Sequence, residues 1–259
     1  TGTSNIAIGY NALYSNTTGE ANNANGSAAL RLNTTGNYNT ANGYHSLYNN
    51  TTGTSNIAIG IYALFSNTTG NDSTANGRQA LYLNNTGSQN TATGKDALYS
   101  NTTGSNNTAN GYQALYSSTG TNNTGIGASA GLDITTGSKN TLLGSYTGNQ
   151  NGLDIRTSNN NVVLSDGDGN IRFYANSSGN VGLGTTNPTE KLTVVGVTSS
   201  TSFYGDASYT ASGRWTLGAN GSADYTFTGI GFTQTTNDPV LYLARGRVYE
   251  FVNNSGGGH

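Results

Sequence analysis

The stretch Asn5-x-Ala7-x-Gly9-x-x-Ala12-Leu13-x-x-Asn16-Thr17-Thr18-Gly19 decides the fold, because it returns along the chain with a fixed period. A short fixed period is typical of a solenoid, in which each repeat forms one coil stacked on its neighbours. The sequence therefore predicts a rod, which spans distance or displays surface. The first glycine of the unit recurs every 17 residues, at Gly9, Gly26, Gly43, Gly60, Gly77, Gly94 and Gly111.

Each unit is predicted to contain two short strands and a turn. The Asn-Thr-Ala-x-Gly segment alternates as a strand does, and Tyr112-Gln113-Ala114-Leu115-Tyr116 is interpreted as a second strand. Asn-Thr-Thr-Gly supplies the turn, with Gly available for a positive φ and Asn able to hydrogen-bond its own backbone. Stacking then gives a narrow interior column of Ala7, Ala24, Ala41, Ala58, Ala75, Ala92 and Ala109, and a wider one of Leu13, Leu30, Leu47, Leu64, Leu81, Leu98 and Leu115.

Two further columns carry amide and aromatic side chains. One Leu and two Ala per coil supply only ~2–4 kcal/mol of transfer free energy, against an ordering cost of ~1 kcal/mol or more for each residue. This core is too thin for a single chain, so we expect the aromatic column to pack on identical neighbours around a threefold axis. The amide column is expected to form a side-chain ladder through Asn5, Asn22, Asn39, Asn56, Asn90 and Asn107, with Ser73 as the exception, and the aromatic column contains Tyr14, Tyr48, Phe65, Tyr82, Tyr99 and Tyr116.

The repeat array is predicted to cover residues 1–152. The eighth coil, centred on Gly127, arrives one residue early because the turn Ser117-Ser118-Thr119-Gly120 has lost a position, and the ninth is centred on Gly144. Both coils replace the Ala-Leu pair, as terminal repeats of a solenoid do. We expect the lost residue to shift the phase of the Ala and Leu columns, and the roll to narrow or twist there.

The composition excludes several classes of function. Only 8% of the residues are charged and the net charge is −2, which gives no footprint for nucleic acid or an anionic membrane. No apolar run approaches the roughly 18 residues of a transmembrane helix. Without Cys there is no disulfide, thiolate metal site or cysteine nucleophile. Because Met is absent and Thr1-Gly2 matches the end of an Asn-Thr-Thr-Gly turn, we expect the sequence to continue upstream.

Residues 153–205 are predicted to form a β-hairpin collar, and the sequence pattern changes from residue 159 onward. Strand, tight turn and strand are expected over residues 161–174. Asn187-Pro188 should interrupt the strands before Lys191-Leu192-Thr193-Val194 resumes pairing, because Pro cannot donate to a ladder. The collar is expected to be tightly interwound over residues 159–200.

The segment Gly179 to Gly196 resembles an element common in trimeric bacteriophage tail fibres, Gly-Asn-Val-Gly-Ile-Gly-Thr-x-x-Pro-x-x-Lys-Leu-x-Val-x-Gly, with Leu183 in place of Ile. The upstream repeat resembles the Asn-Thr-Ala-Ile-Gly-Tyr-x-Ala-Leu arrays of phage fibres and, more loosely, the heads of trimeric autotransporter adhesins. Residues 206–259 are expected to form a third, β-sandwich-like module. Its two strands around Arg245-Gly246, with the pattern Leu-x-Arg-Gly-x-x-Tyr-x-Phe-x-Asn, resemble a strand pair of cupredoxin-like domains. In those domains a His near the position of His259 can be a metal ligand.

No catalytic, cofactor-binding or metal site is expected. Asp166-x-Asp168-x-Asn170 has the opening spacing of a calcium loop, but the closing Glu is missing and Arg172 follows, which favours a plain hairpin turn. His259 lacks the Cys and Met that a type 1 copper site uses.

The resemblance and the repeat together imply an all-β, parallel β-solenoid in a homotrimeric fibre, followed by the collar and the C-terminal module. We expect a structural, non-enzymatic segment of a phage tail, located in the extracellular virion, that spaces or presents a receptor-binding tip. Its expected partners are identical chains, other tail proteins and a host surface glycan or protein, without nucleic acid or membrane insertion. The alternative is the stalk of a bacterial trimeric surface adhesin. Receptor contact within this segment would fall on exposed variable positions, namely Tyr44, His45, Arg78 and Lys95.

Overall fold

The computed structural model describes residues 2–195, 215–219, 225–229, 232–237 and 251–253. The described residues form strands, turns and bends, and none of them lies in a helix. The chain divides into two units, residues 1–198 and 199–259. The first unit is a β-solenoid, as the sequence predicts.

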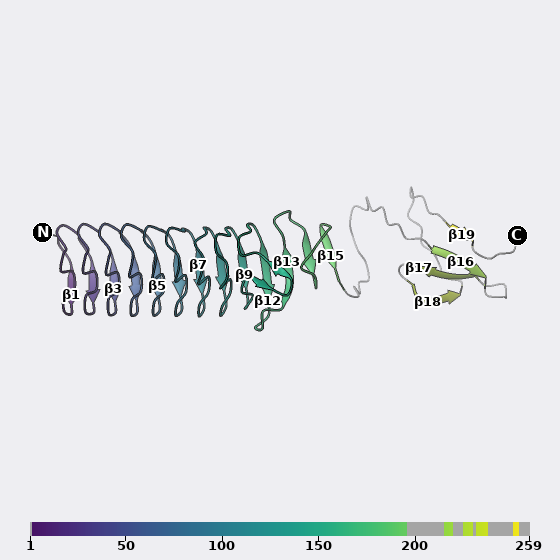
Figure 1. The fold of residues 1–259 in the computed structure, drawn as a ribbon, viewed down its shortest axis with the longest axis horizontal. Coiled ribbons are helices and arrows are strands. Elements are labelled where there is room, and N and C mark those ends of the chain that lie inside the picture. The colour runs from purple at the N-terminus through teal and green to yellow at the C-terminus, as the bar shows by residue number, and fades with distance from the viewer. Residues whose placement is uncertain (1, 196–214, 220–224, 230–231, 238–250, 254–259) are drawn as a thin grey trace. The chain divides into compact units, whose positions relative to one another are not determined.

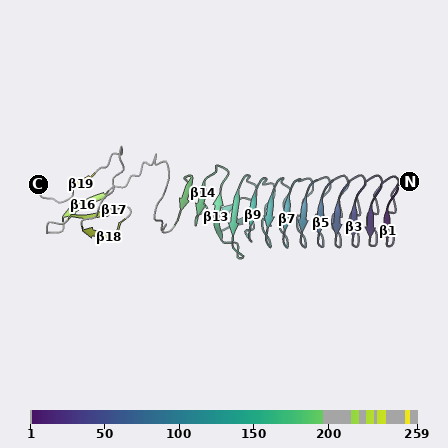
Figure 2. The same ribbon diagram turned by 180° about the vertical axis from the view of Figure 1, so that it is seen from behind.

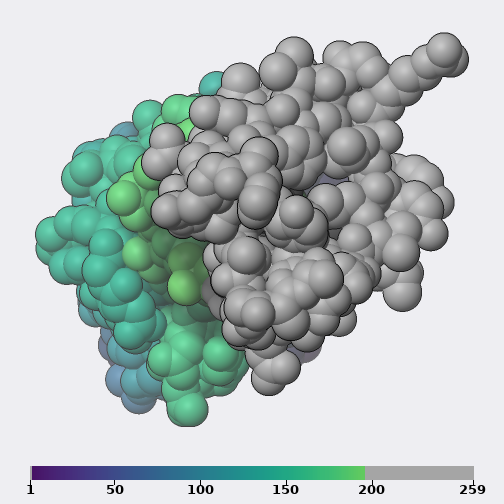
Figure 3. Space-filling view, turned by 90° about the vertical axis from the view of Figure 1, so that its right-hand side faces the viewer, coloured from purple at the N-terminus to yellow at the C-terminus, as the bar shows by residue number. Residues whose placement is uncertain are grey.

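Nine stacked coils each contribute one three-residue strand to a parallel sheet (Figures 1 and 2). Neighbouring strands pair in register, so that Ala41 lies between Ala24 and Ala58. In Figure 3, which looks along the row of coils, the later residues of the first unit, in green and teal, lie in front of the earlier coils, in blue. The predicted strand of each unit is thus confirmed, as β1 (Ile6–Ile8), β2 (Asn23–Asn25), β3 (Thr40–Asn42), β4 (Ile57–Ile59), β5 (Thr74–Asn76), β6 (Thr91–Thr93), β7 (Thr108–Asn110), β8 (Thr124–Ile126) and β9 (Thr141–Leu143).

The second strand predicted at residues 112–116 is wrong, because this segment is a pair of turns. The N–H of Ala114 donates to the carbonyl of Gly111 at 3.3 Å, and Gln113 and Leu115 have φ values of 53° and 51°. Left-handed residues let the chain reverse within a few positions, although a bulky side chain is rarely found there. The N–H of Leu115 still donates to the next coil. The coil, which spans 16 residues here and 17 in the earlier repeats, therefore closes without losing its hydrogen bonds to its neighbours.

The glycine of the Asn-Thr-Thr-Gly turn is needed for close approach, so the predicted positive φ at this position is wrong. The left-handed glycine is the one after the strand, with a φ of 127° at Gly60. A Cβ on Gly53 would lie 2.4 Å from Oδ1 of Asn50 and 2.5 Å from the carbonyl oxygen of Gly70. A side chain there would push adjacent coils apart, and coil stacking explains why this glycine recurs.

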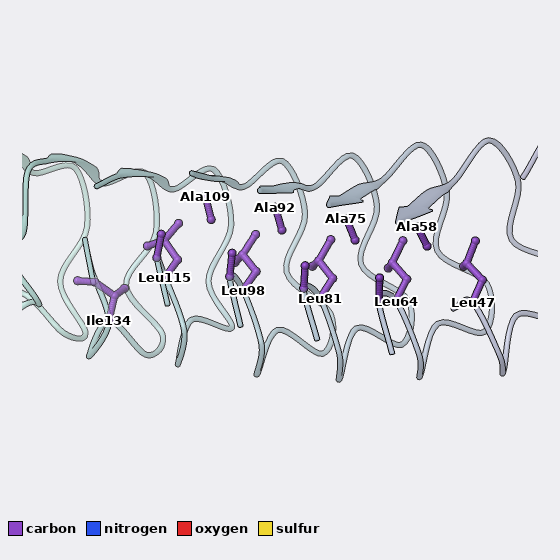
Figure 4. Packing of buried hydrophobic residues seen from close by; sticks show 14 of the residues in the cluster. Leu47, Ala58, Leu64, Ala75, Leu81, Ala92, Leu98, Ala109, Leu115 and Ile134 are labelled. Atoms are coloured by element: carbon purple, nitrogen blue, oxygen red, sulfur yellow. The ribbon is translucent and has the colours of Figure 1, made fainter. Parts of the chain in front are cut away.

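The interior contains the predicted columns of Ala and Leu. Ala58, Ala63 and Leu64 are fully buried in the fourth coil, and Figure 4 shows the leucines in one row with the strand alanines in a second row. Asn56 and Asn67 are also fully buried in this coil. Amide side chains therefore fill much of the space that the apolar residues leave.

The predicted amide ladder is confirmed. Oδ1 of Asn39 accepts the N–H of Asn56 at 3.0 Å, and Nδ2 of Asn56 donates to the carbonyl of Gly70 at 2.8 Å. Ser73 continues the ladder through its hydroxyl, which accepts the N–H of Asn90 at 3.3 Å. Each rung thus joins two coils as well as two parts of one coil.

A second amide ladder runs through the turns, where the sequence indicated only local bonding. Nδ2 of Asn67 donates to Oδ1 of Asn50 at 2.9 Å and to the carbonyl of Gly70 at 3.0 Å. Both bonds are buried, so this ladder is a structural element of the core. Its members are Asn16, Asn33, Asn50, Asn67, Asn84 and Asn101.

The residue missing near Ser118 does not shift the strand columns, so the predicted change of phase is wrong. Thr108 pairs with Thr124, and Thr124 with Thr141, without a slip. The turn absorbs the deletion, but Ser118 replaces the ladder amide and Oδ1 of Asn101 is left buried without a hydrogen-bond partner. The replacement of the ladder Asn by Ser118 therefore ends the second ladder, and the lost residue leaves the sheet intact.

Beyond β9 the chain leaves the coil pattern and continues the same sheet. A short antiparallel pair, β10–β11, is inserted, and β12 then adds parallel to β9. β12 and β13 form the predicted antiparallel hairpin, and Asn187-Pro188 lies between β14 and β15, as predicted. The strands are β10 (Asn149–Gln150), β11 (Leu153–Asp154), β12 (Val162–Ser165), β13 (Ile171–Ala175), β14 (Val181–Leu183) and β15 (Leu192–Val194).

The second unit contains a four-stranded sheet in the order β18-β17-β16-β19. β16 and β19 are parallel, and the other two pairs are antiparallel. Most of the strand pair that resembles cupredoxin-like domains, together with His259, lies outside the described residues. The strands are β16 (Trp215–Ala219), β17 (Tyr225–Gly229), β18 (Phe232–Asn237) and β19 (Phe251–Asn253).

Candidate interaction surfaces

The outward side of the solenoid sheet, here called the sheet face, changes character along the rod. Each strand places its central residue inward and the two flanking residues outward. The flanking residues are Thr and Asn in many of the first seven coils. In β8 and β9 the second flanking residue becomes apolar, and from β12 onward both are apolar. One register column of the sheet face runs through Ile126, Leu143, Leu164, Phe173, Leu183 and Val194.

These apolar side chains, apart from the half-buried Phe173, are exposed to solvent within one chain. Leu143, Leu164 and Leu183 are each 37–38% exposed, and Ile126 is 42% exposed. Earlier in the rod, Ile57 and Ile59 of β4 are each 40% exposed. A contiguous apolar row of this kind marks an interaction surface more often than isolated exposed residues do.

A second surface, here called the aromatic face, is formed by the turns that directly follow each strand of the solenoid, such as residues 112–116. The rings of Tyr48, Phe65, Tyr82, Tyr99 and Tyr116 stack in sequence, with centroids 5.0–5.3 Å apart. This spacing suits offset aromatic stacking. Desolvation, followed by the neighbouring tyrosines, raises the pKa of Tyr99. The aromatic column is therefore confirmed, and its rings find much of their contact within one chain.

Arg31 occupies the same column in the second coil, although the sequence predicts only aromatic members for this column. Its guanidinium carbon lies 5.8 Å from the ring centroid of Tyr14 and 5.5 Å from that of Tyr48. Both distances fall within cation–π range. The signal was available in the sequence, because Arg31 lies 17 residues from each of these tyrosines.

The four predicted receptor-contact residues lie on the aromatic face, but they do not form one cluster. The rings of Tyr44 and His45 stack, with their centroids 4.0 Å apart. The His45 ring also stacks on Tyr48, with centroids 4.8 Å apart. His45 is half-buried, although the variety of residues at its repeat position predicts an exposed side chain. Desolvation and the charge of Arg31 lower the pKa of His45.

The other two members lie further along the rod. Arg78 is exposed. Nζ of Lys95 lies 3.4 Å from Oδ2 of Asp96 and 5.2 Å from the ring centroid of Tyr112. Arg78 and Lys95 occupy the same repeat position in adjacent coils, since they are 17 residues apart.

The candidate calcium loop is a hairpin turn, as predicted. Oδ1 of Asp166 accepts the N–H groups of Asp168 and Asn170, at 3.1 and 2.9 Å, and Oδ2 accepts from the Arg172 guanidinium. The Asn170 N–H and then Arg172 lower the pKa of Asp166 to about 2. Across the described residues there is no group of three or more His, Cys, Asp or Glu side chains placed to hold a metal ion.

Comparisons with protein-family models, curated proteins and solved structures give no match for this chain. In the described part of the chain, no helix is long and apolar enough to cross a membrane. The chain is a β-solenoid repeat protein, with one apolar and one aromatic surface along its coils.

Proposed function

We propose that this chain is a shaft segment of a homotrimeric fibre from a phage tail, which spaces or presents a receptor-binding tip. The stacked coils suit a rod, because nine parallel strands about 4.8 Å apart extend roughly 40 Å. The resemblance of residues 179–196 to phage tail fibres supports the phage assignment. A structural role accounts for a chain built from repeated, identical contacts.

The observation that carries the trimer is the exposed apolar row of the sheet face. Three chains with their sheet faces toward a common axis would bury Ile126, Leu143 and Leu164 on their counterparts. The aromatic column was the first expectation for this contact. Its rings already stack within one chain, whereas the sheet face has no cover within the first unit. We therefore propose the sheet face as the threefold contact.

Single cysteines test which surface faces the axis, because the chain has no Cys of its own. Asn110→Cys places a thiol on the sheet face, and Tyr112→Cys places one on the aromatic face of the same coil. Under mild oxidation, Asn110→Cys should give disulfide-linked pairs of chains and Tyr112→Cys should give none. Native mass measurement should give three chains. The opposite cross-linking pattern would contradict the sheet-face contact, and a stable monomer would contradict the trimer.

The phage assignment is tested by the complete reading frame and its neighbouring genes. We expect tail structural genes nearby and a chaperone or receptor-binding tip downstream. A downstream membrane-anchor barrel would contradict the phage assignment and favour the adhesin stalk.

A further inference from the structure

Basic side chains in the first seven coils lie on one side of the rod. Residues 2–120 contain three basic residues, Arg31, Arg78 and Lys95, and three acidic ones, Glu20, Asp72 and Asp96. Arg31 stacks within the aromatic column, and Arg78 and Lys95 share the position of Tyr44 and Tyr112 in their coils. Of the acidic residues, Glu20 and Asp72 follow the Asn-Thr-Thr-Gly turn at the other end of the coil. The aromatic face is thus locally basic on a chain that is acidic overall.

The acidic residue that does lie on this face is neutralised by its neighbour. Asp96 is 8% exposed, and its Oδ2 pairs with Lys95. Its Oδ1 is buried and has no hydrogen-bond partner within the chain. Arg78, by contrast, is exposed and forms no ion pair among the described residues. A cation without an internal partner is therefore available to a ligand.

The exposed edge of this face combines cations with aromatic rings in a regular array, here called the outer column. Within it, Tyr10 is 78% exposed, Tyr44 is 44% exposed and Tyr112 is 47% exposed. Successive members are separated by one coil, or about 4.8 Å, which is close to the length of one pyranose unit in an extended polysaccharide. The outer column contains Tyr10, Ser27, Tyr44, Ile61, Arg78, Lys95 and Tyr112.

We propose that the outer column binds an acidic polysaccharide that lies along the coils, with Arg78 recognising its carboxylates. Guanidinium and ammonium groups form charge-assisted hydrogen bonds with carboxylates. Exposed tyrosine rings pack against the apolar C–H faces of sugars, and their hydroxyls hydrogen-bond to sugar oxygens. The proposal deepens the proposed fibre function, and it rests on that function only in taking the sheet face as occupied by sister chains.

Nucleic acid fits this surface less well than an acidic glycan does. Duplex DNA carries about one negative charge per 1.7 Å of its axis. The aromatic face offers three basic residues over seven coils, and one of them is already paired with Asp96. The outer column holds only two cations, Arg78 and Lys95, in adjacent coils, and exposed tyrosine rings at other positions along it. This arrangement suits a sparsely charged sugar polymer better than a dense row of phosphates.

The test measures binding of the purified protein to three probes by calorimetry at low and physiological salt. Oligogalacturonate presents both sugar rings and carboxylates. Its fully methyl-esterified form presents the same rings without charge, and inorganic polyphosphate presents charge without rings. We expect saturable binding of oligogalacturonate, at least about tenfold tighter than binding of either other probe, and weaker at higher salt.

Matched variants locate the site. Arg78→Gln should weaken oligogalacturonate binding by about tenfold, which is the effect of losing one charge-assisted contact. Tyr112→Ala should weaken it through loss of the ring. Lys139→Gln removes an equal charge from an exposed residue outside the outer column, and it should bind as the unaltered protein does. Because Arg78 and Lys139 are both exposed, the melting temperatures of both variants should be unchanged.

Several outcomes would overturn the proposal. These are absent oligogalacturonate binding, equally tight binding of polyphosphate or of the methyl ester, and equal losses in Arg78→Gln and Lys139→Gln. Equal binding of polyphosphate would indicate attraction by charge alone. The number of chains is measured separately by native mass and cross-linking, so a failure of glycan binding leaves the trimer proposal standing, and the reverse also holds.

Discussion

The second amide ladder makes a quantitative prediction at Asn50, which lies in its middle. Nδ2 of Asn50 donates to Oδ1 of Asn33 at 2.8 Å and to the carbonyl of Gly53 at 3.0 Å, and its Oδ1 accepts from Asn67 at 2.9 Å. Asn50→Ala removes all three bonds, each with a net value of about 1 kcal/mol, and leaves Oδ1 of Asn33 buried without a donor. We expect the free energy of unfolding to fall by about 3–5 kcal/mol.

Asn50→Asp tests the direction of the hydrogen bonds, because it keeps the acceptor and removes the donor. The new carboxylate would be fully buried and would face two acceptors, Oδ1 of Asn33 and the carbonyl of Gly53. Burial and these acceptors raise its pKa in the folded state above the unfolded value of about 3.9. The protonated form can donate one bond, so the stability of the variant is greatest below about pH 3.9 and falls as the pH rises through the raised pKa.

Urea unfolding followed by circular dichroism at pH 7 and pH 3.5 provides the measurement. Each variant is compared with the unaltered protein at the same pH, so that other titrating groups cancel. Asn106→Asp is the matched control, since Asn106 is exposed and its φ of 60° is tolerated by Asp. At pH 7, Asn50→Asp should be less stable than Asn50→Ala, and at pH 3.5 it should recover. If Asn50→Asp matched the control at both pH values, the ladder would not be a structural element.

Three further predictions concern the coil interior, the strained backbone and the hairpin turn. Leu64→Ala should lower the free energy of unfolding by about 3 kcal/mol, because it leaves a cavity in the leucine column. Leu83→Ala, at a position that is 37% exposed, should lower it much less, and equal losses in urea unfolding would contradict a buried leucine column. Gln89 is exposed with a φ of 59°, so Gln89→Gly should be more stable than Gln89→Ala by roughly 0.5–1 kcal/mol, and the reverse order would show that the left-handed backbone carries no strain. The pKa of Asp166 is lowered from 3.8 to about 2, so its contribution to stability is present above about pH 4 and is lost as the pH falls toward 2. In thermal melts, Asp166→Asn should remove this part of the acid dependence, and Asp168→Asn should keep it.

The strands and interior columns could be predicted because their signals are periodic. Alternation around Ala58 indicates a strand, and the 17-residue return of Leu64 indicates stacked coils. The turn pair at Gln113 and Leu115 could not be predicted, because bulky residues carry no local preference for a positive φ. Coil closure and hydrogen bonds between coils impose that conformation on them. The place of Arg31 in the aromatic column could be predicted from the 17-residue period alone, because the period assigns a column to a residue whatever its type.

The coil interior is larger than the one Leu and two Ala that the sequence predicts for it. Asn56 and Asn67 are buried beside Ala58, Ala63 and Leu64. A buried amide costs free energy unless it is hydrogen-bonded, and here successive coils supply the partners. Each coil therefore depends on the next one for its polar core as well as for its sheet. The aromatic column is therefore not needed as the contact in the proposed trimer. In that proposal the sheet face forms the contact between chains, and the aromatic face stays open to the proposed ligand.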